Sequence, residues 1–336
     1  MPGGKRPPLQ LYSEHYAAHL AAGWEDLLKF FEEEGISRRS LGLLTRAWDY
    51  VLVTYVKARY RARASRSLVV HALLAVQKRK RWTRAALPRA WAWTWAWRER
   101  APPKASTPCP RPILEAILGV LFGLATMSST EALRRKFWTA LGALWMGFEG
   151  MLRPCEFATA RTDTMVFGEE LGDLESPYLV VVVETPKNRR AFGVHQYVLV
   201  DSPPLVCFMK WIYDATTAGL PLFKGGRQAL ATIFEDALAM LLIPRGTFTV
   251  RSLRPGKASE DFRLTRNVQA LQFTGRWRRL QTMHSYLQEA AAALVSGKLS
   301  MESRSCVEAA RQTFLTLRSE CDVGVPGVCR RAFAGR

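Results

Sequence analysis

Residues Thr247–Tyr286 read TFTVRSLRPGKASEDFRLTRNVQALQFTGRWRRLQTMHSY. Arg251 and Arg254 are three residues apart, a spacing that places two side chains on one face of a helix. Two guanidinium groups held together grip a phosphate bidentately, which two lysines cannot do. Trp277 follows, and nine residues later comes Tyr286, the last tyrosine of the chain. Because nearby cations stabilise a phenolate, the stretch predicts a phosphate site with a tyrosine nucleophile on a helix.

These residues resemble the second half of the catalytic domain of tyrosine recombinases, the phage-integrase family of DNA strand-exchange enzymes. That family carries a His-x-x-Arg pair, then a Gly-His or Gly-Trp box, then the nucleophilic tyrosine about nine residues on. Arg254 falls on the second arginine of the family, Trp277 on the His-or-Trp position and Tyr286 on the nucleophile. Arg251 stands where the family usually has histidine. This is a departure, because an arginine stays charged and cannot relay a proton.

The resemblance also implies a first arginine, an acid three residues after it, and a lysine in a β-hairpin turn. The apolar helical run ALGALWMGFEGMLRPCEF closes on Arg153, with Pro154 as a helix breaker and Glu156 three residues on. Two β-rich runs, YLVVVVE at Tyr178–Glu184 and VHQYVLV at Val194–Val200, flank a turn that contains Lys187. The resemblance therefore covers about 190 residues, from near Pro112 to about Leu299.

Each of these residues has an ordinary structural interpretation as well. A basic helix face, a core tryptophan, a half-buried tyrosine, a helix C-terminal cation and a hairpin lysine are all common. Their order along the chain favours the functional interpretation. The candidate catalytic residues are Arg153, Lys187, Arg251, Arg254, Trp277 and Tyr286.

Composition indicates a polyanionic partner. The 336 residues carry a net charge of +19, and the pI is about 10.1. Between Lys57 and Lys104 there are fourteen Lys or Arg against one acid, Glu99. Cations at that density bind double-stranded DNA through its phosphates, whereas a solvated surface usually interleaves acids. The residues expected to contact DNA are Lys57, Arg59, Arg61, Arg63, Lys78, Arg79, Lys80 and Arg81.

Several other classes of protein are not indicated. The six cysteines show no C-x-x-C pair and no histidine at metal-ligand spacing, so we expect reduced thiols, no metal and no cofactor. There is no phosphate-binding glycine-rich loop and hence no sign of ATP use. The longest apolar stretch, Ile113–Met127, contains Glu115 and is too short to span a bilayer, and the N-terminus lacks a signal-like apolar run. We therefore expect an intracellular, DNA-associated protein, nuclear if the source is a eukaryote.

The expected fold is mainly α with a small antiparallel β-sheet, in two domains. Residues 1–9 are expected to be disordered, 10–100 helical, 101–112 a proline-rich linker, 113–299 a mixed domain and 300–336 a helix with a tail. Residues 90–100 hold four tryptophans at alternate positions, but Pro88 and the alanines favour a helix whose indoles pack internally. The strands expected are 164–167, 178–184 and 194–200, and the helices expected in the same domain include Thr130–Leu152 and Met283–Ser296. The resemblance implies that 10–100 is a core-binding domain that clamps DNA and 113–299 the catalytic domain.

The resemblance also implies a mechanism. Tyr286 attacks a phosphodiester to give a 3′-phosphotyrosyl link, Arg153 and Arg254 hold the non-bridging oxygens, and Lys187 protonates the leaving 5′-oxygen. Trp277 packs against the phosphate and donates its indole N–H.

Glu156 is expected to orient Arg153. The resemblance also implies that copies of the chain associate on DNA as a tetramer and that the protein is a recombinase of a mobile element. The helix around 306–319 is expected to pack either on its own domain or on a neighbouring copy.

Two other functions remain open. A DNA-binding protein that has lost activity is favoured by Arg251, and a type IB topoisomerase shares the catalytic residues. The chain length and the short N-terminal helical region fit a recombinase better.

Overall fold

The computed structural model describes residues 14–101, 106–173, 177–184, 186–187, 193, 195–284, 286–287 and 289–322. The chain divides into two compact units, Met1–Lys104 and Ala105–Arg336. The predictions for residues 1–9, for the middle of the linker and for the end of the tail lie outside the described residues. Each unit has a core of its own, so each is described by itself.

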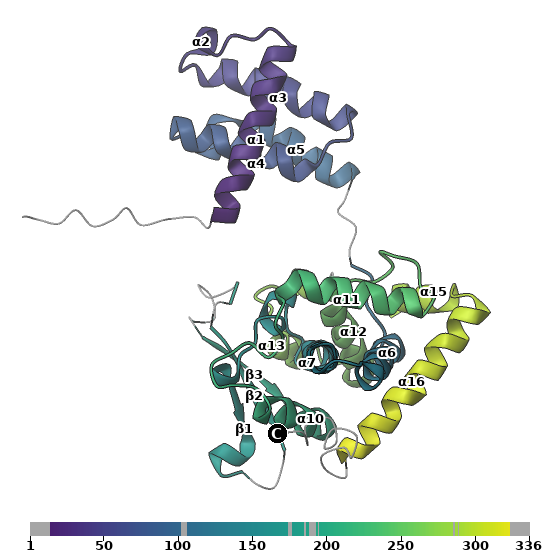
Figure 1. Ribbon diagram of the computed structural model, residues 1–336. Helices are drawn as coiled ribbons and strands as arrows, with labels where there is room; N and C mark the ends of the chain where they lie inside the picture. The colour runs from purple at the N-terminus through teal and green to yellow at the C-terminus, as the bar shows by residue number, and fades with distance from the viewer. Residues whose placement is uncertain are drawn as a thin grey trace, which may run out of the picture. The chain divides into compact units, whose positions relative to one another are not determined.

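The first unit is helical. Its elements are α1 (Glu14–Glu33), α2 (Arg38–Leu41), α3 (Thr45–Arg61), α4 (Arg66–Lys80), the 3₁₀ turn η1 (Arg84–Ala86) and α5 (Pro88–Arg100). Helix α1 packs on α4, and α3 packs on α5 (Figure 1). Phe30, Trp48 and Tyr55 are fully buried at the centre of this unit. Gly23 permits the contact of α1 with α4, because a Cβ there would lie 2.5 Å from the backbone nitrogen of Ala72.

Helix α5 confirms the helical interpretation of the tryptophan-rich stretch. It begins at Pro88, whose fixed φ suits the first turn of a helix. Trp91 and Trp97 are buried, whereas Trp95 is half exposed. The expectation of internal packing thus holds for Trp91 and Trp97.

The second unit is mainly helical and contains one small sheet. Its helices are α6 (Arg111–Met127), α7 (Glu131–Glu149), α8 (Pro154–Phe157), α10 (Pro203–Asp214), α11 (Gly226–Met240), α12 (Leu253–Thr265), α13 (Val268–Thr274), α14 (Leu280–His284), α15 (Glu289–Gly297) and α16 (Met301–Asp322). The 3₁₀ turns are η2 (Thr162–Thr164), η3 (Gly168–Leu171) and η4 (Val250–Ser252). The strands are β1 (Met165–Phe167), β2 (Leu179–Val183) and β3 (Gln196–Val200), antiparallel in the order β1-β2-β3. The register pairs Met165 with Val181 and Leu179 with Val200.

Helices α6 and α7 occupy the middle of this unit, and the other helices and the sheet surround them (Figure 1). Leu144 and Phe148 of α7 are fully buried there. Helix α16 packs against α6. The two helices touch at Gly119, where a Cβ would lie 1.8 Å from the carbonyl oxygen of Ala310. Of the two expectations for the helix around 306–319, the structure shows packing on its own unit.

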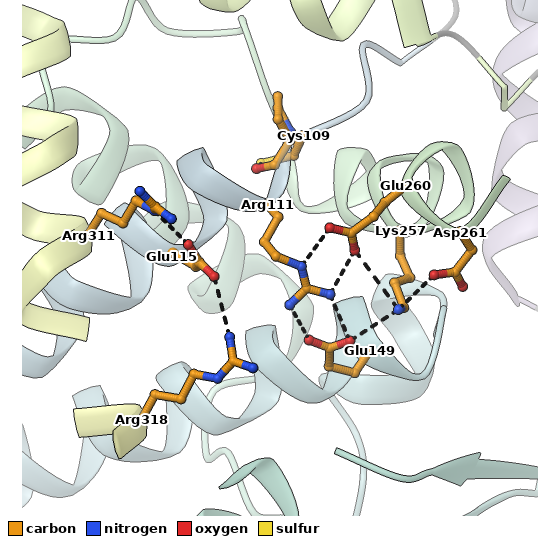
Figure 2. Close-up of polar contacts among 10 residues, drawn as sticks. Cys109, Arg111, Glu115, Glu149, Lys257, Glu260, Asp261, Arg311 and Arg318 are labelled. Atoms are coloured by element: carbon orange, nitrogen blue, oxygen red, sulfur yellow. Dashed lines mark hydrogen bonds and ion pairs between the residues drawn. The ribbon is translucent and has the colours of Figure 1, made fainter. Parts of the chain in front are cut away.

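Ion pairs join α16 to α6 (Figure 2). The carboxylate of Glu115, almost fully buried, accepts a 2.8 Å hydrogen bond from Arg311 Nε and lies 3.7 Å from Arg318 Nη1. A buried carboxylate is stable only with such partners, because desolvation disfavours an unpaired charge. The pairs therefore favour this packing of α16.

A second cluster of charges joins α12 to α6 and α7 (Figure 2). Arg111 donates 2.7 Å hydrogen bonds to Glu149 on α7 and to Glu260 on α12, and Lys257 lies 3.4 Å from Glu149. Burial would raise the pKa of Glu149, but Arg111 and Lys257 outweigh it and lower that pKa. This cluster fixes α12 against the central helices, and α12 carries Arg254 in its first turn.

Several boundaries differ from the expected ones. Arg111 and Pro112, expected in the linker, begin α6. The helix expected to run to Leu152 ends at Glu149, and Met151 adopts a left-handed backbone with φ 45°. The single helix expected over 283–296 is two helices, α14 and α15.

Candidate active site

A cleft of about 540 Å³ in the second unit collects most of the candidate catalytic residues. Its lining includes the cations Arg153, Lys187, Arg227, Arg251 and Arg254, together with Tyr286. The remaining lining residues are Ser106, Pro154, Cys155 and Pro255, so no carboxylate lines the cleft within the described residues. Because the charged side chains on its walls are all cations, this concave site is suited to an anion.

Arg153 is the N-cap of α8, which Pro154 begins. The expectation that Pro154 breaks a helix after Arg153 was therefore wrong, because proline is well suited to a first helical turn. Glu156 accepts a 2.6 Å hydrogen bond from Arg153 Nη1 and a 2.8 Å bond from the backbone N–H of Arg153. The predicted contact of Glu156 with Arg153 is thus present in the structure.

Lys187 is exposed and lies in the connection between β2 and β3, as expected. Neighbouring residues 185 and 188–192 lie outside the described ones. The two strands pair through Val183 and Gln196, which fixes the ends of the connection. Lys187 therefore reaches the cleft from the sheet, whereas the arginines reach it from helices and turns.

Arg251 and Arg254 do not share a helix face. Arg251 is exposed and lies in η4, whereas Arg254 is buried and lies at the second position of α12. The expectation of one helical face was wrong because the chain changes from a 3₁₀ turn to an α-helix between them. Both arginines nevertheless line the cleft.

The guanidinium of Arg254 is held by backbone carbonyls. Its Nη1 donates a 2.9 Å hydrogen bond to the carbonyl of Met151, and its Nη2 donates to the carbonyl of Gly275. The guanidinium carbon lies 4.7 Å from the ring centre of Trp277. Burial, with repulsion from Arg153 and Arg276, lowers the pKa of Arg254 to about 9. A bound anion would relieve that electrostatic cost.

Trp277 and Tyr286 belong to a small apolar cluster with Met151, Ala258 and Met283. Trp277 is buried, and the centres of the Trp277 and Tyr286 rings are 5.4 Å apart. Trp277 therefore packs against Arg254 and Tyr286, and the predicted indole hydrogen bond to a phosphate stays a prediction.

Tyr286 lies in a turn between α14 and α15, so its expected place on a helix was wrong. Its backbone N–H donates a 2.8 Å hydrogen bond to the carbonyl of Met283, three residues earlier, and Ser259 Oγ donates to its carbonyl. Because an i→i−3 bond replaces the helical i→i−4 bond, the chain leaves the helix at this point. The half-buried side chain of Tyr286 reaches the cleft from this turn.

Two arginines near the cleft were not predicted. Arg227 lies at the second position of α11, and its sequence signal is the preceding Gly225-Gly226 pair, which marks a loop before a helix. Arg276 stands between Gly275 and Trp277 within the quoted stretch, and its side chain is 8% exposed. No sequence pattern shows that this arginine is buried.

The basic segment of the first unit is only partly available to a partner. Arg61, Arg63, Lys78, Arg79 and Arg81 are exposed. The Nζ atoms of Lys57 and Lys80 lie over tryptophan rings, 4.5 Å from the centre of Trp93 and 4.9 Å from that of Trp48, and the guanidinium carbon of the exposed Arg79 lies 4.2 Å from the centre of Trp24. Such cation–π contacts fix the stems of these side chains without neutralising them.

Arg59 does not fit the predicted DNA-contact set. Its side chain is 16% exposed, with Nε 3.0 Å from Asp26 and Nη1 3.4 Å from Glu33. Asp26 also accepts a 2.6 Å hydrogen bond from the hydroxyl of Tyr55. Because these partners neutralise Arg59 within the unit, we remove it from the set.

The described part of the chain gives no sign of a metal site, a disulfide bond or a membrane-spanning helix. No group of three or more His, Cys, Asp and Glu residues there is placed to hold a metal ion. Among the described residues, no disulfide bond involves Cys109, Cys155, Cys207, Cys306 or Cys321. Among those same residues, no helix has both the length and the apolar character needed to cross a membrane.

Comparison with solved structures decides the fold. A XerH site-specific recombinase bound to a palindromic difH substrate, in a post-cleavage complex, matches with a TM-score of 0.53 and 12% identity over 80% of this chain and 75% of that chain. The chain has the tyrosine-recombinase fold. It is mainly α with a small antiparallel sheet, as predicted.

Two further solved structures match with lower TM-scores. XerH bound to difH in a pre-cleavage complex has a TM-score of 0.48 at 10% identity, covering 87% of this chain and 91% of that one. A XerA recombinase has a TM-score of 0.38 at 13% identity, covering 85% and 99%. No protein-family model matches the sequence, and no curated protein matches it significantly. The tyrosine-recombinase fold therefore rests on the first match.

Proposed function

We propose that this protein is a site-specific DNA recombinase that breaks and rejoins double-stranded DNA through a covalent link to Tyr286. The observation that carries the proposal is the cleft itself. Tyr286 lines it together with Arg153, Lys187, Arg251 and Arg254, and these residues come from separate elements of the tyrosine-recombinase fold. This combination supplies a nucleophile, a proton donor and a cationic pocket in one place.

The electrostatics of the cleft favour a phosphodiester as its ligand. Burial lowers the pKa of Arg254, and repulsion from Arg153 and Arg276 lowers it further. Each Nη of Arg254 carries a second N–H besides the one that binds a backbone carbonyl. A phosphate oxygen would accept these hydrogen bonds and offset the repulsion between the cations.

In the proposed step the hydroxyl oxygen of Tyr286 attacks phosphorus, a bond forms between the tyrosine oxygen and phosphorus, and the bond from phosphorus to the 5′-oxygen breaks. Lys187 gives a proton to that leaving oxygen. Arg153 and Arg254 stabilise the negative charge that gathers on the non-bridging oxygens. Rejoining is the reverse attack by a 5′-hydroxyl, so the sequence of steps needs neither a cofactor nor ATP.

Arg251 shapes the pH dependence of this step. In place of the usual histidine it adds a cation to the cleft but cannot accept the phenol proton near neutral pH. The proton of Tyr286 then passes to solvent. We propose that the cleavage rate of this protein rises with pH through the neutral range for that reason.

We further propose that the first unit is a core-binding domain that holds the DNA duplex. Its exposed cations, Arg61, Arg63, Lys78, Arg79 and Arg81, suit phosphate contacts that carry no sequence information. Copies of the chain would associate on DNA as a tetramer, in the manner of a phage-type integrase that acts on the ends of a mobile element.

A second candidate function is a DNA-binding protein that keeps the fold and has lost cleavage. Arg251 favours it. Incubation of the protein with nicked suicide DNA that carries candidate sites separates the two, because only an active enzyme gives a covalent protein–DNA adduct. Tight binding without an adduct on any such DNA would support the inactive protein, and relaxation of any supercoiled plasmid without exchange between sites would support a topoisomerase.

A further inference from the structure

Arg276 has a backbone conformation that a glycine would adopt more easily. Its φ is 53°, in the left-handed region, and its N–H donates a 2.9 Å hydrogen bond to the carbonyl of Phe273. Side chains with a Cβ are disfavoured at such an angle, whereas glycine is not. The local backbone geometry therefore does not explain why this residue is an arginine. Residues with a strained backbone are concentrated at functional sites, so a functional role of the side chain is the natural explanation.

The side chain of Arg276 connects two elements that carry candidate catalytic residues. Nη2 donates a 2.8 Å hydrogen bond to Glu156 Oε2, and Nη1 lies 3.3 Å from Gln196 Oε1. Glu156 is in the short helix that Arg153 caps, and Gln196 is the first residue of β3, at the end of the connection that contains Lys187. Arg276 thus links the Arg153 side of the cleft to the Lys187 side.

Glu156 is shared between two guanidinium groups. One oxygen binds Arg153 Nη1 at 2.6 Å, and the other binds Arg276 Nη2 at 2.8 Å. Burial would raise the pKa of Glu156, but the charges of Arg276 and Arg153 outweigh it, so the carboxylate stays ionised. Two cations and one anion leave a net charge of +1. If Arg153 were the only partner of Glu156, the carboxylate would instead cancel the positive charge of Arg153 at the wall of the cleft.

We propose that Arg276 is a positioning residue: through Glu156 it holds the guanidinium of Arg153 in place for the scissile phosphate, and through Gln196 it fixes the base of the Lys187 connection. This inference rests on the proposed function of the cleft. Arg276 itself does not line the cleft, so its role is distinct from that of the phosphate-contacting arginines.

The test is Arg276→Gly in the full chain, which removes the side chain and suits the backbone. Arg266→Gly is the matched control, because Arg266 has φ 52°, is exposed and is the C-cap of α12, and its replacement removes the same single charge. Adduct formation at saturating nicked DNA should fall at least about tenfold in Arg276→Gly, less than the roughly 10²–10³-fold loss of a direct transition-state donor. DNA affinity should change less than about twofold, because phosphate contacts over the whole duplex dominate it.

Rescue and coupling separate positioning from a merely structural role. Arg276→Lys keeps the charge beside Glu156 and should restore cleavage to within a few-fold of the wild type. In a Glu156→Gln background, Arg276→Gly should lower cleavage less than it does in the wild type, because the connection to Arg153 is already weakened and only the contact with Gln196 is left to lose. Wild-type cleavage by Arg276→Gly, or full additivity with Glu156→Gln, would overturn the proposal.

A measurement without DNA keeps this inference separate from the proposed function. In protein labelled with ¹⁵N-arginine, the Nε–H resonance of Arg153, assigned by Arg153→Lys, should shift in Arg276→Gly and stay in place in Arg266→Gly. If the wild type forms no adduct but this shift occurs, the proposed function fails and the link to Arg153 stands. If the resonance does not move, the link is refuted whatever the protein does to DNA.

Discussion

Substitution of Arg254 by lysine tests the structural and the chemical role of this residue together. Arg254 donates hydrogen bonds to two backbone carbonyls, those of Met151 and Gly275, and lies over the ring of Trp277. A lysine ammonium reaches one of these carbonyls and leaves the other buried without a partner. An unpaired buried polar group costs about 1–3 kcal/mol, and the weakened cation–π contact adds about 0.5–1 kcal/mol.

The expected loss in unfolding free energy is therefore about 1.5–4 kcal/mol, the sum of an unpaired carbonyl and a weaker cation–π contact. For a domain of this size that lowers the melting temperature by roughly 3–16 °C. Lysine also lacks the planar fork that holds a phosphate oxygen, so cleavage should fall by about 10²–10³-fold. DNA binding should change far less, because the charge is kept and the duplex has many other contacts.

Thermal unfolding, DNA affinity and adduct formation on nicked DNA measure these three effects. The matched control is Arg251→Lys, because Arg251 is exposed and should change stability by less than about 0.5 kcal/mol. Unchanged stability of Arg254→Lys would refute the assigned hydrogen bonds. Equal losses in binding and cleavage would show that Arg254 acts only as a charge.

Three further predictions follow from other parts of the molecule. A fivefold glutamine variant of the first unit should bind duplex DNA more weakly and with a smaller salt dependence; the replaced residues are Arg61, Arg63, Lys78, Arg79 and Arg81. Arg59→Gln should mainly lower the stability of the protein. An unchanged salt dependence of binding in the fivefold variant would show that the first unit does not contact DNA. Arg251→His should raise the cleavage rate near pH 7, because histidine can accept the phenol proton, and an unchanged pH–rate profile would remove proton transfer as the limiting step. The pKa of Glu156 is below its ordinary value of 4.5, so the stability that its ionised form contributes is present above pH 4.5 and is lost as the pH falls through the lower folded-state pKa. Glu156→Gln should remove that part of the acid dependence of unfolding, and acid denaturation curves identical to those of the wild type would contradict this prediction.

The sequence predicted the fold class and most of the cleft, because the decisive residues stand at fixed spacings in elements with clear patterns. The apolar period and Pro154 marked the region of Arg153, and two β-rich runs marked the turn of Lys187. Those signals are local. They can be recognised in a single sequence without any knowledge of tertiary contacts.

What the sequence could not show depends on tertiary contacts or on small changes in backbone geometry. The break at Tyr286 falls in a stretch without glycine or proline, so nothing local signals that the helix ends there. Arg59 lies 33 residues from Asp26, which neutralises it. Arg276 looks like one cation among several, and only the fold buries it between Glu156 and Gln196.

The most direct test of the central claim is to identify the atom that carries the DNA. Nicked suicide DNA should trap the wild-type protein as an adduct, and mass spectrometry of its peptides should find the 3′-phosphate on Tyr286. Tyr286→Phe should fold and bind DNA as the wild type does, because it removes one hydroxyl and keeps the ring against Trp277, yet it should form no adduct. An adduct mapped to another residue, or one that persists in Tyr286→Phe, would contradict the assignment of the nucleophile.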